Sequence, residues 1–186
     1  APAAGEVTGI SGKEVWNYNS GKQWWYETRI SLFDVSDGNI FVGFADNGFA
    51  DPATVPTDCI GFSHLEDTTT IQFISRKNGA GTSFDMPVTA GGSNYTLLDS
   101  TVPTQTATQL EIPSNSVRLG FHFQPAGTEL GQTSAQYKLY LDGKKVGTQA
   151  ATTVPDDIAL ELKFFLENKG INANGLNTDG VQTIQQ

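Results

Sequence analysis

The feature that most constrains this chain is an alternation of apolar and polar residues that is broken by short turns. It is clearest in residues 135–147, AQYKLYLDGKKVG, where one face carries Tyr137, Leu139 and Leu141. A period of two residues is typical of a half-buried β-strand. Asp142-Gly143 follows, and both residues tolerate the positive φ that a two-residue hairpin turn requires. The segment therefore predicts a β-hairpin.

The same pattern recurs along most of the 186 residues. Asn78-Gly79 predicts a second hairpin turn, and residues 40–45 are apolar on both faces, which is typical of a central strand covered on both sides. No stretch keeps a helical apolar stripe without a helix breaker. We therefore expect an all-β chain with two antiparallel sheets, a sandwich or jelly roll. The predicted strands cover residues 6–10, 24–33, 40–45, 60–65, 69–76, 82–88, 109–112, 117–123, 137–141, 144–146, 159–166 and 176–184.

The length is that of one domain. We expect residues 16–186 to form a single β-sandwich. Residues 1–15 are short of core-forming side chains, so we expect an N-terminal arm that orders against a partner. The side chains expected in the core are Trp24, Tyr26, Ile30, Leu32, Val42, Phe44, Ile71, Phe73, Leu119, Phe121, Leu139, Leu141, Leu162 and Phe164.

The composition excludes some classes of partner. Twenty acidic against eleven basic side chains give a net charge of −9, which argues against nucleic acid because Lys and Arg must neutralise its phosphates. No apolar segment is long enough for a membrane span. Cys59 is the chain's one cysteine, so no intramolecular disulfide can form, and its apolar surroundings predict a buried, inert thiol. The two histidines, His64 and His122, lie alone in their strands and predict no metal site.

Three segments in order resemble the concanavalin A-like (laminin-G-like) jelly-roll superfamily. They are WYETR at 25–29 with FVGFA at 41–45, IGF at 60–62 with FISRKNG at 73–79, and YLDGKKVG at 140–147. The resemblance covers about residues 15–185. Within that superfamily, the order of the motifs resembles small structural proteins of tailed bacteriophage virions.

This resemblance implies a non-enzymatic virion protein without a cofactor. It would be made in the bacterial host cytoplasm and then act as a capsid decoration or cement protein on the capsid exterior. Its partners would be capsid shell subunits and further copies of itself, since it would be a homo-oligomer on the particle. A tail or fibre-associated protein is the next possibility. The alternative is a carbohydrate-binding module or lectin of the same fold, whose partner would be a glycan on a host surface.

The superfamily also includes glycosidases, which need paired carboxylates in a Glu-x-Asp-x-x-Glu pattern. Arg29 follows Glu27 where the second carboxylate should be, and Lys163 follows Glu161 at the same offset. Glu66-Asp67 are adjacent, so on a strand they would point to opposite faces. We therefore expect no hydrolase activity.

Asp46, Asp51 and Asp58 flank a Pro-containing loop. Laminin-G-like domains often bind Ca²⁺ at a rim loop, and hard oxygen ligands suit this ion. The resemblance therefore makes these aspartates the one weak Ca²⁺ candidate in a chain otherwise expected to bind no metal. The alternative is that they are solvated loop charges.

Tryptophan supplies the candidate binding residues. Neighbours Trp24 and Trp25 must face opposite sides of their sheet, so Trp25 shares the outward face with Glu27 and Arg29. Together with Trp16, Trp25 and Arg29 are the candidates for either glycan binding or a protein interface, since Trp is enriched at interface hot spots. The remaining alternative is a Trp25 shielded by the N-terminal segment.

Overall fold

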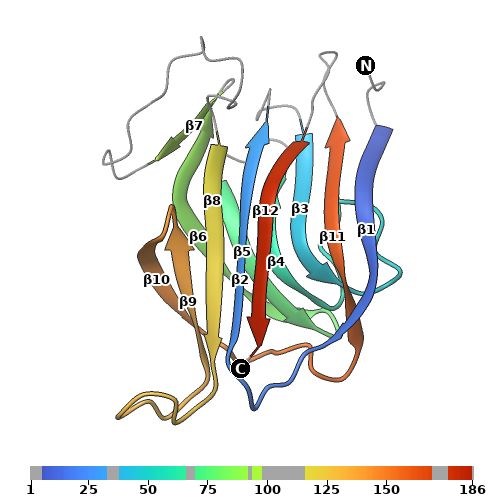
Figure 1. Cartoon of the computed structure of the whole chain (residues 1–186). Coiled ribbons are helices and arrows are strands. Elements are labelled where there is room, and N and C mark those ends of the chain that lie inside the picture. The colour runs from blue at the N-terminus through green and yellow to red at the C-terminus, as the bar shows by residue number, and fades with distance from the viewer. Residues whose placement is uncertain are drawn as a thin grey trace.

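The computed structural model describes residues 6–32, 38–65, 70–91, 94–97, 116–168 and 176–185. These ranges contain twelve β-strands and no helix (Figure 1), which confirms the all-β prediction. Accordingly, the described ranges hold no helix that could cross a membrane. The strands are β1 (Glu6–Asn17), β2 (Trp24–Leu32), β3 (Gly38–Ala45), β4 (Cys59–His64), β5 (Thr70–Lys77), β6 (Ala80–Gly91), β7 (Asn94–Leu97), β8 (Ser116–Gln124), β9 (Gln136–Leu141), β10 (Lys144–Ala150), β11 (Ala159–Asn168) and β12 (Leu176–Gln185).

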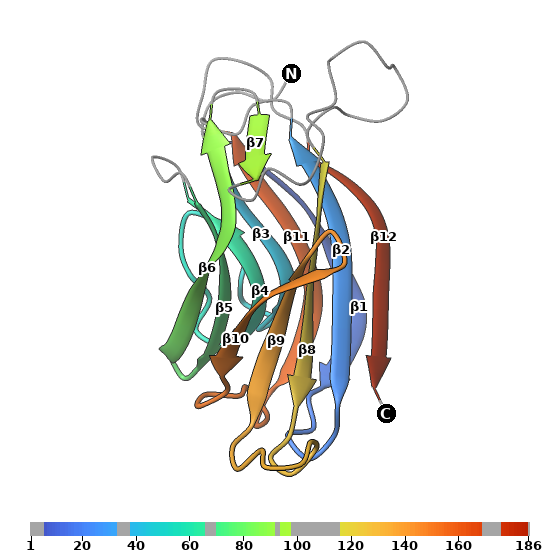
Figure 2. The same cartoon turned by 90° about the vertical axis from the view of Figure 1, so that its left-hand side faces the viewer.

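The strands form two antiparallel sheets that pack face to face (Figures 1 and 2). Sheet A has seven strands in the order β1-β11-β3-β4-β5-β6-β7, and sheet B has five in the order β10-β9-β8-β2-β12. Strands β3–β7 form a meander in sheet A, and strands β8–β10 form a meander in sheet B. The remaining neighbours (β1 and β11, β11 and β3, β8 and β2, β2 and β12) are not consecutive in sequence, so the chain crosses between the sheets repeatedly. This arrangement is the predicted two-sheet jelly-roll sandwich.

The main core fills the space between the two sheets, as the alternation predicts. On β2, Trp24, Tyr26 and Ile30 are buried whereas their outward neighbours stay partly exposed. Phe44 and Phe73 meet them from sheet A. Of the predicted core side chains, Leu32 lies outside the described side chains, and all others but Leu162 are buried.

Leu162 is only half-buried, which corrects the prediction. It lies beside Gly12, where a Cβ would be 3.4 Å from the Leu162 Cβ. The β1–β11 ladder also shifts register between Ser11 and Val15. Because Gly12 has no side chain to place over it, Leu162 keeps contact with solvent.

Both predicted hairpin turns are present. Asn78 and Gly79 have φ values of 51° and 79°, and Asp142 and Gly143 have 49° and 80°. Two successive positive φ angles define the type I′ turn, whose twist matches that of the strands it joins. The local sequence therefore fixes these two pairings.

Most of the predicted N-terminal arm is instead the edge strand β1. Residues 6–17 pair with β11 from Glu6 opposite Asn168 to Asn17 opposite Ala159. Gly9 interrupts the apolar pattern of β1. The Phe165 ring occupies the space beside it, since a Cβ on Gly9 would lie 1.9 Å from Cδ1 of Phe165. Main-chain bonds hold an edge strand without a full apolar face, so the sandwich begins by residue 6, and residues 1–5 lie outside the described chain.

The loop of residues 46–58 covers the outer face of sheet A. The Phe49 ring lies 5.0 Å from that of Phe41 and 5.7 Å from that of Phe165. Together with the buried Cys59 and Ile74, these rings form a second apolar cluster. Every residue of β3 is consequently buried, which confirms that residues 40–45 are covered on both sides.

Candidate functional site

Three aromatic side chains gather on the outer face of sheet B. The Trp25 ring centroid lies 4.8 Å from that of Tyr140 and 5.7 Å from that of His122, with the ring planes tilted by 59° and 58°. All three side chains are partly exposed. We call Trp25, His122 and Tyr140 the aromatic platform.

The sheet order explains how these residues meet. Strand β8 lies between β2 and β9, and it places His122 opposite Trp25 and Gly120 opposite Tyr140. Two strand spacings separate β2 from β9, roughly 9–10 Å. Trp25 and Tyr140 reach contact because their rings extend toward each other across β8, which itself carries His122. The order of β2, β8 and β9 therefore brings the three rings together.

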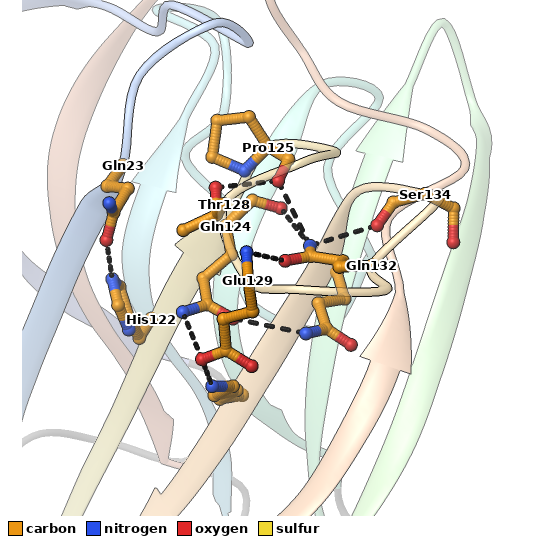
Figure 3. A network of polar contacts seen from close by, with 10 residues as sticks. Gln23, His122, Gln124, Pro125, Thr128, Glu129, Gln132 and Ser134 are labelled. Atoms are coloured by element: carbon orange, nitrogen blue, oxygen red, sulfur yellow. Dashed lines mark hydrogen bonds and ion pairs between the residues drawn. The ribbon is translucent and has the colours of Figure 1, made fainter.

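A network of polar side chains borders the platform on the side of His122, and Figure 3 shows His122 together with this network. His122 Nε2 donates to Oε1 of Gln23 at 3.0 Å. Lys138, the cross-strand partner of His122, donates to and pairs with Glu129. Gln124 Nε2 also donates to Glu129 Oε1, at 3.1 Å. We call Gln23, Gln124, Glu129 and Lys138 the polar rim.

The Gln132 side chain fixes the loop that carries Glu129 (Figure 3). Its Oε1 accepts from the Glu129 N–H at 3.2 Å, and its Nε2 donates to the carbonyls of Pro125 and Ser134, both at 3.0 Å. Thr128 Oγ1 adds a bond of 2.7 Å to the Pro125 carbonyl. The backbone of this loop is therefore ordered by the chain itself, and the polar rim is preformed.

The charges of the platform follow from these contacts. Partial burial lowers the pKa of His122 below its ordinary value, and the Lys138 ammonium lowers it further. The hydrogen bond from Lys138 holds the pKa of Glu129 below its ordinary value, and the bond from Gln124 acts in the same direction. At neutral pH the platform thus offers a neutral imidazole beside a carboxylate–ammonium pair.

Two of the three predicted binding residues lie on this face and one does not. Trp25 and Arg29 alternate with buried residues on β2 and point outward, as predicted. Trp16 instead packs against the core between the sheets, with its ring 5.6 Å from that of Phe44. The structure therefore separates Trp16 from the other two residues.

The three candidate Ca²⁺ ligands have other partners. Asp58 accepts from the Asn78 N–H at 2.8 Å, and Asp46 accepts from the Asp58 N–H at 3.4 Å, so these two close the base of the loop. Asp51 accepts from the Ala53 N–H at 2.9 Å within the loop. Among the described residues, no three acidic, His or Cys side chains are arranged to hold a metal ion.

Sequence reasoning missed His122 and Tyr140 as members of the site. Their strands do alternate, so each could have been placed on an outward face. What the sequence lacks is the strand order that brings β2, β8 and β9 together, because Trp25 lies 97 positions from His122. Only the β2–β8–β9 order of sheet B makes the three residues neighbours.

Comparisons with known proteins support the fold described above. No protein-family model and no curated protein matches the chain. Several solved structures are similar to it, three of which follow. The carbohydrate recognition domain of Emp46p has a TM-score of 0.53 and 8% identity, over 98% of this chain and 79% of that one. The globular domain of T. cruzi calreticulin has 0.52 and 8%, over 95% and 68%. A prokaryotic β-1,3-1,4-glucanase from a mouse hindgut metagenome has 0.51 and 14%, over 95% and 69%.

Identities this low show a shared fold and nothing about activity. The two antiparallel sheets and the similarity to these three structures define the architecture of this chain as a concanavalin A-like jelly-roll sandwich. The predicted fold is therefore confirmed, and what the protein does must be argued from its own side chains.

Proposed function

We propose that this chain is a carbohydrate-binding domain that holds its ligand on the outer face of sheet B. The observation that carries the proposal is the aromatic platform, with Trp25 and Tyr140 in contact at 4.8 Å and partly open to solvent. One face of a pyranose ring presents C–H groups, and these pack well against the negative face of an aromatic ring. The platform offers such faces on a rigid sheet.

The polar rim supplies the second half of sugar recognition. Hydroxyl groups of a sugar both donate and accept hydrogen bonds, so they need donors and acceptors in fixed positions. Gln23, Glu129 and Lys138 provide both kinds beside the platform. Because Gln132 orders the loop in advance, little conformational entropy is lost on binding.

The shared fold supports this proposal. By their descriptions, one neighbour is a carbohydrate recognition domain and another is a β-glucanase, so the sandwich is compatible with carbohydrate ligands in other chains. The identities are too low to transfer a site. The residues proposed here come from the geometry of this chain alone.

We also propose that the chain does not hydrolyse its ligand. A glycosidase acid must stay protonated, which requires a raised pKa. Hydrogen bonds from lysine act in the opposite direction: Lys163 lowers the pKa of Glu161, Lys138 that of Glu129, and Lys77 that of Asp156. These carboxyl groups suit binding better than acid catalysis.

The test is calorimetric titration of the purified chain with soluble polysaccharides, followed by product analysis. We expect binding without release of shorter sugars, and loss of binding in Trp25→Ala. Tyr140→Phe should retain affinity because it keeps the ring, whereas Tyr140→Ala should lose it. Ile10→Ala, on the exposed edge strand, is the control and should bind normally. Binding that is indifferent to Trp25→Ala would overturn the proposed site.

A virion role is the second candidate. Trp25 and Tyr140 on an outward sheet face have the composition of a protein-interface hot spot as well, with capsid shell subunits or further copies of the chain as partners. This proposal expects the chain on the particle exterior. Co-sedimentation with phage particles, abolished by Trp25→Ala in the absence of any glycan binding, would favour it over the first.

A further inference from the structure

Basic side chains continue the aromatic platform on sheet B. Four of the chain's eleven Lys and Arg residues occupy outward positions of this sheet. Lys138 lies opposite His122, and Lys145 lies opposite Tyr140. Arg29 and Arg118 lie opposite each other in the next outward row along β2 and β8. This concentration is unexpected in a chain of net charge −9.

Arg29 and Arg118 place two like charges opposite each other on β2 and β8. Like charges directly opposite each other in an antiparallel ladder destabilise the sheet. Arg118 forms an ion pair with Glu27, whose Oε1 lies 3.7 Å from Nη1 of Arg118, which is too far for a hydrogen bond. An anion between the two guanidinium groups would relieve this repulsion.

Arg118 is the better placed of the two to receive an anion. Its side chain is 39% exposed. Its Nη2 lies over the β9–β10 turn, where a Cβ on Gly143 would approach it to 2.6 Å. Asp142 of this turn accepts from the Arg118 N–H at 3.1 Å, which fixes the backbone beneath the guanidinium. Arg29 has Asp179 at the paired position on β12, so the argument depends mainly on Arg118.

We propose that the ligand of this face is an acidic glycan, whose sugar rings pack on the aromatic platform while a carboxylate or sulfate group binds Arg118 and Arg29. The proposal rests on the carbohydrate-binding function proposed above and names its ligand class. Trp25 and Arg29 are four residue steps apart on an extended strand, roughly 13–14 Å. This span suits an oligosaccharide with a charged group one or two sugars away from the stacked ring.

The geometry and the overall charge both favour this class. A guanidinium presents a planar fork of donors that matches a carboxylate or sulfate bidentately. The net negative charge of the chain would repel a polyanion elsewhere, whereas Arg29, Arg118, Lys138 and Lys145 attract it to this face, where Glu27 and Glu129 are already paired with Arg118 and Lys138. Neutral sugars would use the platform alone and bind more weakly.

The experiment compares matched pairs of polysaccharides that differ only in charge. Dextran sulfate is titrated against dextran, and polygalacturonate against its methyl ester, in low and in high salt. We expect tighter binding of the charged member of at least one pair, weakened by salt. Which pair responds distinguishes a sulfate from a carboxylate ligand.

Variants then locate the anion. Arg118→Gln should weaken binding of the charged polymer about tenfold, the equivalent of one charge-assisted hydrogen bond. Arg118→Lys, which keeps the charge but loses the fork, should recover only part of the affinity. Lys77→Gln removes a cation from β5 of sheet A and is the control. Circular dichroism checks that each variant is folded.

The outcomes separate this proposal from the one on which it rests. Equal binding of charged and neutral polymers, lost in Trp25→Ala but unchanged in Arg118→Gln, would overturn the acidic ligand and leave the carbohydrate-binding function standing. If Lys77→Gln and Arg118→Gln weakened the binding of charged polymers equally, the attraction would be non-specific, and this would also overturn the acidic ligand. No binding of any polysaccharide would overturn both.

Discussion

Truncation of Phe121 to alanine tests the arrangement of the core. This side chain is fully buried on β8, in the centre of sheet B, and it contacts rings from both sheets. The surrounding ring centroids lie within 6.2 Å and belong to Trp24, Tyr26, Phe62, Phe73 and Tyr137. Removing the Phe121 ring therefore takes a contact from each of them.

The expected loss follows from these contacts. Truncation of a buried Phe costs about 3–5 kcal/mol, and the cost rises when neighbours cannot fill the cavity. Tyr26, Phe62 and Phe73 are each at most 1% exposed, so none can move into the space without losing its own packing. We therefore expect about 4–5 kcal/mol. For a chain of this length, each kcal/mol lowers Tm by about 2–4 °C, so Tm should fall by roughly 8–20 °C.

Equilibrium urea denaturation, followed by tryptophan fluorescence, measures this loss. Ile10→Ala is the control, because this side chain is 67% exposed on the edge strand and should change the free energy of unfolding by less than about 0.5 kcal/mol. A loss below about 2 kcal/mol for Phe121→Ala, or one no larger than that of Ile10→Ala, would refute the assigned core.

Two further perturbations test the sheet contacts and the platform. In Gly61→Ala the new Cβ would lie 2.5 Å from the Val42 carbonyl oxygen, so we expect the free energy of unfolding to fall by about 1–3 kcal/mol in urea denaturation. Gly12→Ala is the control and should be nearly neutral, because the nearest neighbour of its new Cβ is at 3.4 Å. Equal effects of the two substitutions would contradict the close approach of β3 and β4. Burial and Lys138 lower the pKa of His122 in the folded state, so the unfolded chain takes up this proton at higher pH. The stability that neutral His122 contributes is complete above its ordinary pKa and is lost as pH falls through the folded value. His122→Gln should flatten this part of the stability–pH curve, and an unchanged slope would refute the lowered pKa of His122 in the folded state.

The sequence predicts strands and turns well because each carries its own signal. The alternation on β2, β8 and β9 reports which side chains face the core, and the two type I′ turns report hairpin pairing. Strand β1 has no such signal. It is held by pairing with β11 and by neighbours such as Phe165, which occupies the space that Gly9 leaves. An edge strand of this kind can be predicted only when its partner strand is known.

The site could be predicted only in part, for a related reason. The outward direction of Trp25 and Arg29 follows from β2 alone. The exclusion of Trp16 does not, because a strand's own pattern does not tell which sheet it joins or which side chains cover it. The pairing of Asp46 with Asp58 across the loop base likewise needs the β3–β4 ladder to bring the two ends together.

The arrangement of the aromatic platform bears on how this face could bind with useful affinity. Trp25 and Tyr140 stand on adjacent regions of a sheet whose inner face is a dense aromatic core, so their positions are set before a ligand arrives. Gln132 does the same for the loop that carries Glu129. Affinity on an open face has to come from few contacts, and each is worth more when no ordering cost precedes it. The proposed carbohydrate binding would therefore depend on preorganisation of this face by the fold.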